Sequence, residues 1–251
     1  MSDQDAVQCL AVIPARWASS RFPGKPVTLI AGKMMIERVW QRTCQASHVD
    51  AVVVATDDTR IAEACEARGI PWVMTASDHA TGTDRLAEVA QKRTARFYLN
   101  VQGDEPLIDP QTIDAVAKRL INAAEQGIEV ATAYMDGASE EQKTSPSTVH
   151  LVPTLDQCVL TFSRLPVPHP FQAPFDHKVH VGLYGYTKAS LERFAQWSRG
   201  PVEQAESIEP LRFLERGERI ACVPVPSRSI GVDHPEDVVK VEAMLRERGL
   251  E

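Results

Sequence analysis

Short apolar runs that alternate with segments of helical spacing are the feature that most constrains the fold of this chain. The first run, 10–13, and the second, 49–55, are almost continuously apolar, which is typical of strands buried on both faces. Similar runs follow at 70–74 and 97–101, and segments with apolar residues three and four apart, such as 34–46, lie between the runs. This order predicts an α/β fold with a doubly wound, mostly parallel sheet.

The first apolar run leads into a loop that carries three cations, Arg16, Arg21 and Lys25. In open α/β sheets, loops at the carboxyl ends of the strands bind ligands. Arginine forms paired hydrogen bonds with phosphate oxygens, and lysine places a point charge beside them. The loop therefore predicts a site for an anion, most simply a polyphosphate. The alternative is a solvated basic loop without a ligand.

Two common phosphate-binding motifs are excluded at this loop. Gly24 and Lys25 are followed by Pro26, and no glycine lies five residues before Gly24, so the loop is not a Walker A motif. The G-x-G-x-x-G pattern is also missing from the chain. Neither a P-loop NTPase nor a dinucleotide dehydrogenase is favoured.

The amino-acid composition limits the classes of molecule that this chain is expected to bind. The net charge of −7, from 27 basic and 34 acidic residues, argues against a nucleic-acid binder, so the basic loop suits a small anionic substrate. The five cysteines are scattered and form no C-x-x-C pair, which indicates reduced thiols of the cytosol. The polar start, 1–5, is not typical of a signal peptide, and no apolar run is long enough to span a membrane. A cytoplasmic protein without membrane contact is expected.

One aspartate and one arginine are further candidates for a site. Asp104 follows the strand predicted at 97–101, where a carboxylate is well placed to hold Mg²⁺ over bound phosphates, although many such aspartates cap turns. Asp233 precedes the last predicted helix, where its position suits a helix cap. Arg85 lies in the first turn of a helix, where the helix dipole disfavours a cation, so contact with a ligand is expected.

The loop resembles a known signature. Ile13-Pro14-Ala15-Arg16 followed by Ser20-Arg21-Phe22-Pro23-Gly24-Lys25-Pro26 is similar to the signature loop of the 3-deoxy-manno-octulosonate (KDO) cytidylyltransferases, which make CMP-KDO from CTP and the sugar acid. Segments 82–85, 101–106 and 232–237 resemble further blocks of this family in the expected order. The resemblance implies a Rossmann-like nucleotidyltransferase fold, CTP as substrate, Mg²⁺ as cofactor and a homodimer.

The resemblance also implies roles for individual residues. The implied catalytic residues are Arg16 and Lys25, the implied metal ligands are Asp104 and Asp233, and the implied substrate-binding residues are Ala15, Arg21, Arg85, Gln102, Arg164, His180, Tyr184 and Glu209. Cytosine is expected near Ala15 and Arg85, with the triphosphate on the basic loop.

The chain is expected to be a single nucleotidyltransferase domain, 1–251, with an inserted lobe at about 135–186. The polar segment 135–146 marks the start of this lobe, and strand-like runs after it predict an antiparallel extension. The lobe is expected to serve acceptor binding and dimerisation.

Several residues of the acceptor half depart from the family pattern. Pro210 stands where a glutamine is usual, 165–174 has no charged residue other than a histidine, and His150 stands where a lysine is common. These changes predict an acceptor that is a small carboxylate or phosphonate rather than KDO. The alternatives are a KDO cytidylyltransferase and a non-catalytic nucleotide-binding module.

Overall fold

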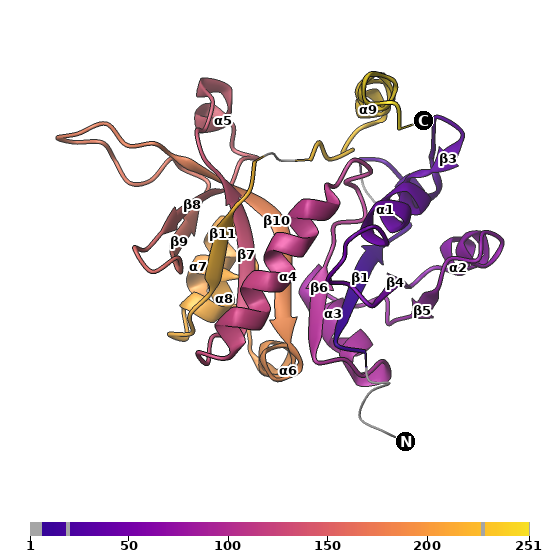
Figure 1. Cartoon of the computed structure of the whole chain (residues 1–251), viewed down its shortest axis with the longest axis horizontal. Helices are drawn as coiled ribbons and strands as arrows, with labels where there is room; N and C mark the ends of the chain where they lie inside the picture. Colours follow the sequence, from indigo (N-terminus) through magenta and orange to yellow (C-terminus); the bar gives the residue numbers. More distant parts are fainter. Residues whose placement is uncertain (1–6, 19–20, 227–228, 251) are drawn as a thin grey trace. The chain divides into compact units, whose positions relative to one another are not determined.

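The structure is a computed structural model and describes residues 7–18, 21–226 and 229–250. The chain forms two units: the first runs to Asp114 and resumes at Ser229, and the second begins at Ala115. In chain order the elements are β1 (Cys9–Ala15), the 3-10 helix η1 (Lys25–Val27), β2 (Leu29–Ile30), β3 (Lys33–Met34), α1 (Met35–Thr43), β4 (Ala51–Thr56), α2 (Thr59–Glu66), β5 (Trp72–Met74), α3 (Gly82–Lys92), β6 (Phe97–Asn100), α4 (Pro110–Ala124), β7 (Val130–Met135), α5 (Glu140–Thr144), β8 (His150–Pro153), β9 (Val159–Ser163), β10 (Lys178–Thr187), α6 (Lys188–Gln196), α7 (Pro201–Glu206), α8 (Leu211–Leu214), β11 (Ala221–Pro224) and α9 (Pro235–Arg248) (Figure 1).

The first unit is built on parallel strands in the order β6-β1-β4-β5 (Figure 1). β1 lies in the middle, pairing Leu10 with Ala51 on one side and Cys9 with Phe97 on the other. Its residues are buried almost throughout because helices cover parallel sheets on both faces. The predicted parallel α/β arrangement is confirmed, and the loops after β1, β4 and β6 leave the sheet at the same edge.

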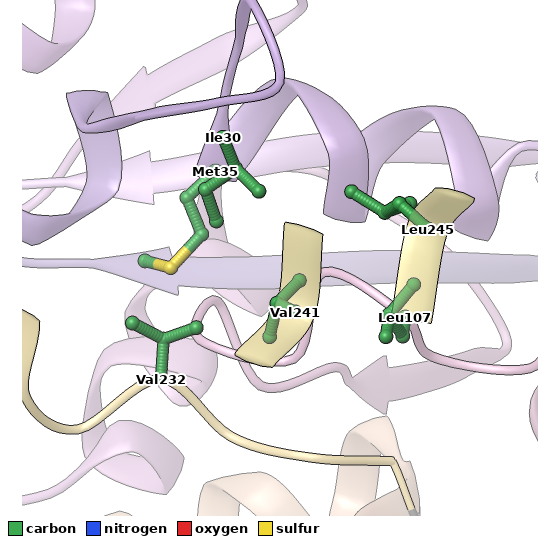
Figure 2. Packing of buried hydrophobic residues seen from close by; sticks show 6 residues of the cluster. All are labelled: Ile30, Met35, Leu107, Val232, Val241 and Leu245. Atoms are coloured by element: carbon green, nitrogen blue, oxygen red, sulfur yellow. The ribbon is translucent and has the colours of Figure 1, made fainter. Parts of the chain in front are cut away.

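The C-terminal helix α9 is attached to the first unit by an apolar cluster. Val232, Val241 and Leu245 pack with Ile30, Met35 and Leu107, and each side chain is at most 2% exposed (Figure 2). Arg38 strengthens the attachment, because its guanidinium donates hydrogen bonds to the carbonyl oxygens of Ile30, Ala31 and Leu250. This packing places Asp233, directly after buried Val232, in the first unit.

The second unit contains the mixed strand set β11-β7-β10-β8-β9 (Figure 1). β11 and β7 are parallel, whereas the β7–β10, β10–β8 and β8–β9 pairs are antiparallel. The antiparallel extension is therefore present. The lobe predicted at about 135–186 lies inside this unit, which begins earlier in the chain, within α4.

One predicted helix start is wrong. The sequence 207–212 predicts a helix that begins at Ser207, but Ser207 is the left-handed C-cap of α7, with φ of 54°. The next helix, α8, begins after Pro210, whose carbonyl oxygen accepts a hydrogen bond from the Phe213 N–H group. A proline suits a helix start because its own missing N–H group is not needed there.

The cysteines of the described residues are free thiols, and Cys44 is the exposed one. Burial raises the pKa of the Cys9 thiol to about 12, with Asp50 and Asp114 adding to the effect. Such thiols stay protonated and unreactive, as expected of structural cysteines. Over the part of the chain that the structure describes, no helix has both the length and the apolarity needed to cross a membrane.

Buried His150 of the second unit is expected to make stability depend on pH. His150 is fully buried, its ring centroid lies 6.1 Å from that of His177, and neither of its nitrogens forms a hydrogen bond of normal geometry to a described residue. Burial lowers the pKa of His150 below its ordinary 6.5, while backbone groups of Lys178 and Gln142 act in the opposite direction. The unfolded chain therefore binds the proton more readily than the folded one.

Neutral His150 is expected to make its full contribution to the free energy of unfolding above about pH 6.5. This contribution is lost as the pH falls toward the lowered pKa of His150 in the folded protein. Melting temperatures measured between pH 7.5 and 5 should fall less steeply for His150→Phe than for the unmodified protein. His169 is exposed, so His169→Gln is the matched control and should leave the slope unchanged. Equal slopes for all three proteins would contradict this assignment.

Candidate active site

Two cations of the basic loop and two aspartates meet in the first unit. Lys25 Nζ lies 2.9 Å from Asp104 Oδ2 and 3.7 Å from Asp233 Oδ1, and it donates a hydrogen bond of 2.8 Å to the Val232 carbonyl oxygen. Arg21 Nη2 lies 3.1 Å from Asp233 Oδ1. The sequence placed these four charged residues in three separate segments, and the fold brings them together at the carboxyl edge of the sheet.

Two glycines allow the backbone to form this site. A Cβ atom on Gly103 would lie 2.5 Å from the Pro14 carbonyl oxygen, so only glycine lets the chain after β6 pass this close to β1. Asp104 is thereby held beside the basic loop, and its own carbonyl oxygen accepts a 2.8 Å hydrogen bond from the Val232 N–H group. Gly24 has φ of 72° and starts η1, whose first residue is Lys25.

The two aspartates fit a divalent metal ion. Their carboxylates converge on the ammonium group of Lys25, so the fold already places a positive charge between them. The Asp104 side chain is 35% exposed and that of Asp233 is 50% exposed, which leaves both open to a ligand. Magnesium needs only one or two carboxylates when substrate phosphates and water complete its shell. Within the described ranges, no group of three or more metal-ligating side chains gathers, at this site or at any other.

Arg85 occupies a different environment from the one its sequence position suggested. It is fully buried, Nη2 lies 3.0 Å from Asp57 Oδ2, and Nη1 donates to the Thr75 hydroxyl. Burial lowers the pKa of Arg85, and Asp57 opposes this effect. The cation that the helix dipole disfavours is compensated by Asp57, so the dipole argument does not require a ligand. Contact between Arg85 and a nucleotide stays a prediction.

The other nucleotide-side residues of the prediction also lie at this edge. Ala15 is the buried last residue of β1, and Arg16 follows it half-buried. Gln102 is half-buried in the loop between β6 and Asp104. Ser20 of the signature loop lies outside the described residues.

The acceptor-side residues of the prediction belong to the second unit. His180 Nε2 lies 3.0 Å from the Thr132 hydroxyl oxygen, and its ring centroid is 5.2 Å from that of Tyr184. Burial raises the pKa of Tyr184 well above its usual value, and the charge of Glu209 adds to this shift. Tyr184 therefore keeps its proton. Roles of His180, Tyr184 and Glu209 in substrate binding stay predictions.

Arg164 has a structural environment in the second unit. Its guanidinium donates to the carbonyl oxygens of Pro146, Glu206 and Ser207, at 2.9, 2.7 and 3.3 Å. Its backbone N–H group donates to the Glu206 carboxylate at 2.9 Å. These bonds join the end of β9 to the turn after α7. A role of Arg164 in substrate binding stays a prediction.

Sequence reasoning missed a contact at the basic loop. The Arg60 guanidinium of α2 lies over the indole ring of Trp17, with Cζ 3.7 Å from the ring centroid. The one sequence feature that could have indicated this contact was Trp17 itself, a large aromatic residue in a polar loop. Its partner, 43 residues away along the printed chain, had no local pattern to identify it.

Comparisons with known proteins place this chain among the cytidylyltransferases. A family model described as Cytidylyltransferase matches residues 10–220. The 3-deoxy-manno-octulosonate cytidylyltransferase of Syntrophotalea carbinolica is 46% identical over 246 residues, covering 94% of this chain and 98% of that protein. The protein of the same name from Escherichia coli is 40% identical over 239 residues, covering 95% of this chain and 96% of its own length.

Solved structures extend the comparison to three dimensions. A CMP:2-keto-3-deoxy-manno-octonic acid synthetase complexed with CTP is similar with a TM-score of 0.91 and 40% identity, covering 96% of this chain and 99% of that one. A cytidylyltransferase from Leptospira borgpetersenii has a TM-score of 0.64 at 17% identity, covering 96% of this chain and 87% of that one, and so supports the fold alone. The predicted nucleotidyltransferase fold is confirmed.

Proposed function

This chain belongs to the 3-deoxy-manno-octulosonate (KDO) cytidylyltransferase family, and we propose that it transfers CMP from CTP to KDO with release of pyrophosphate. Cytidylyltransferase activity follows from the family; the acceptor and the metal ion are the proposal. The observation that carries it is the meeting of Arg21 and Lys25 with Asp104 and Asp233 at the carboxyl edge of a parallel sheet.

In this proposal the protein acts by positioning and charge compensation. Arg21 and Lys25 bind the triphosphate, and Arg16 directly follows the last residue of β1. A hydroxyl oxygen of the acceptor attacks the α-phosphorus and its proton passes to solvent, while the bond to the bridging oxygen breaks and pyrophosphate leaves with that electron pair. Such a transfer requires little covalent chemistry from the protein, so cations held in place supply most of the rate enhancement.

Asp104 and Asp233 would hold the metal ion, for which we propose Mg²⁺. When bound, it supplies positive charge to the phosphate oxygens as a Lewis acid. The same carboxylates bind Lys25 in the structure, so they also orient this lysine.

We propose KDO as the acceptor in place of the small carboxylate or phosphonate. That smaller acceptor was expected because several residues of the acceptor half depart from the family pattern. The relatives named for KDO chemistry are 40–47% identical over nearly the whole chain, and they favour the alternative over that expectation. Two of the departures have structural explanations. Pro210 caps the start of α8, and His150 fills a buried position instead of facing an open site.

A pyrophosphate-release assay tests the proposal with CTP, Mg²⁺ and either KDO or a panel of small phosphonates and carboxylates. We expect saturable CMP-KDO formation, weak activity with the small acceptors and little activity when ATP or GTP replaces CTP. Faster turnover of a small acceptor than of KDO would overturn the acceptor assignment. Pyrophosphate release with no acceptor at all would indicate a different reaction.

We also propose the homodimer that the family resemblance implied. Large apolar side chains of the β8–β9 hairpin and the segment after it are exposed, which supports a second copy as partner. They are Leu155, Leu160, Leu165 and Phe171. The cytoplasmic location expected from the sequence stays a prediction.

A further inference from the structure

Trp17 of the basic loop is in contact with two segments of the first unit. The Arg60 guanidinium lies over the indole, with Cζ 3.7 Å from the ring centroid. Gly24 packs against the same indole, since a Cβ atom added there would lie 3.2 Å from Trp17 Cζ2. The Gly24 N–H group donates a 3.1 Å hydrogen bond to the Trp17 carbonyl oxygen. Trp17 therefore ties one end of the loop to its other end and to α2.

Arg60 is itself fixed in orientation. Its Nε and Nη2 donate hydrogen bonds of 2.8 and 2.6 Å to the two oxygens of Asp58. Asp58 is the N-cap of α2 and accepts a further 2.9 Å bond from the Arg60 backbone N–H group. A planar guanidinium held by two parallel bonds presents a flat face, which suits stacking on an aromatic ring.

The stack of Arg60 on Trp17 contacts the residue that directly precedes Lys25 in the chain. Gly24 directly precedes Lys25, whose ammonium group reaches Asp104 and Asp233. A side chain on Gly24 would meet both a left-handed backbone, with φ of 72°, and the indole. The path of the chain into Lys25 therefore depends on where Trp17 lies.

We propose that Arg60 is a positioning residue, which through Trp17 holds the basic loop so that Lys25 points toward the phosphates of CTP. This inference rests on the proposed function for the identity of the ligand. Asp58 orients Arg60, Arg60 holds Trp17, and Trp17 holds Gly24 at the start of η1. None of these three side chains needs to touch the substrate.

The proposal predicts that loss of the Arg60 side chain acts on the basic loop and not on the stability of the whole fold. The Arg60 side chain is 56% exposed, so its removal leaves no buried cavity and should change the melting temperature little. Arg68 offers a matched control, because its side chain is 46% exposed and pairs with Glu37, away from Trp17. Arg60→Ala and Arg68→Ala should melt at similar temperatures and differ only at the basic loop.

The first measurement needs no ligand. Amide hydrogen exchange at Gly24 and Lys25, followed by NMR, should be faster in Arg60→Ala and in Trp17→Ala than in the unmodified protein. Arg68→Ala should leave both rates unchanged, and Trp17→Tyr should restore protection because it keeps an aromatic face. Equal exchange rates in Arg60→Ala and Arg68→Ala would refute the proposal.

The second measurement is the Kd of CTP with Mg²⁺, by calorimetry without acceptor. We expect Arg60→Ala to raise Kd about two- to fivefold, the range for an exposed cation–π contact, and the Arg60→Ala/Trp17→Ala double variant to bind no worse than Trp17→Ala alone. Additive effects would show that the two residues act independently, contrary to the proposal. If exchange accelerates as expected but the unmodified protein does not bind CTP, the loop contact stands and the proposed function fails.

Discussion

Replacing Asp104 with asparagine is expected to lower turnover of CTP about 100-fold or more while the protein stays folded. The asparagine keeps the shape of the side chain but removes the charge, which the proposal assigns to the metal ion and the phosphates. The same charge lies 2.9 Å from Lys25 Nζ, so its loss also weakens the orientation of the lysine. Steady-state pyrophosphate release over a range of Mg²⁺ concentrations measures the effect.

Asp233→Asn should behave similarly but less severely, since Asp233 is half exposed and lies farther from Lys25. Glu236 is the matched control because it is an exposed acidic residue in the first turn of α9, three residues after Asp233. Glu236→Gln should retain full activity. Near-normal turnover of Asp104→Asn at limiting Mg²⁺ would mean that the metal assignment is wrong.

Replacing Lys25 with alanine is expected to lower turnover about 100- to 1,000-fold, because a fixed cation would be lost from the triphosphate site. A smaller effect on stability should accompany it. The Lys25 side chain is 14% exposed, and its ammonium group joins Asp104 to the Val232 carbonyl oxygen, so its removal should reduce the free energy of unfolding by about 1–3 kcal/mol. Turnover per folded molecule and denaturant unfolding curves separate the two effects.

Lys33→Ala is the control for this experiment, since Lys33 is a half-buried lysine of β3 in the same unit. It should change neither quantity appreciably. If Lys25→Ala lost stability to a similar extent but kept normal turnover per folded molecule, Lys25 would be a structural lysine and the phosphate assignment would fail.

Local patterns in the sequence determined much of this fold. The buried parallel strands were predictable because near-continuous apolar runs are stable only when covered on both faces. The sequence before α2 offers Asp57 and Asp58 as possible caps of this helix, and Asp58 is the cap in the structure. The helix starting at Ser207 was mispredicted because the left-handed turn there separates two short helices, a detail without a strong local signal.

The candidate site was likewise predictable from the sequence only in part. Local patterns identified the charged residues that follow strand ends, Lys25 and Asp104 among them. Their contact across 79 residues of chain, and the pairing of Arg85 with Asp57 in place of an open site, could be known only from the folded structure. The physical reason is that burial and charge pairing depend on which elements pack together. A helix dipole or an apolar run is encoded locally, whereas the partner of a buried charge is set by the whole packed unit.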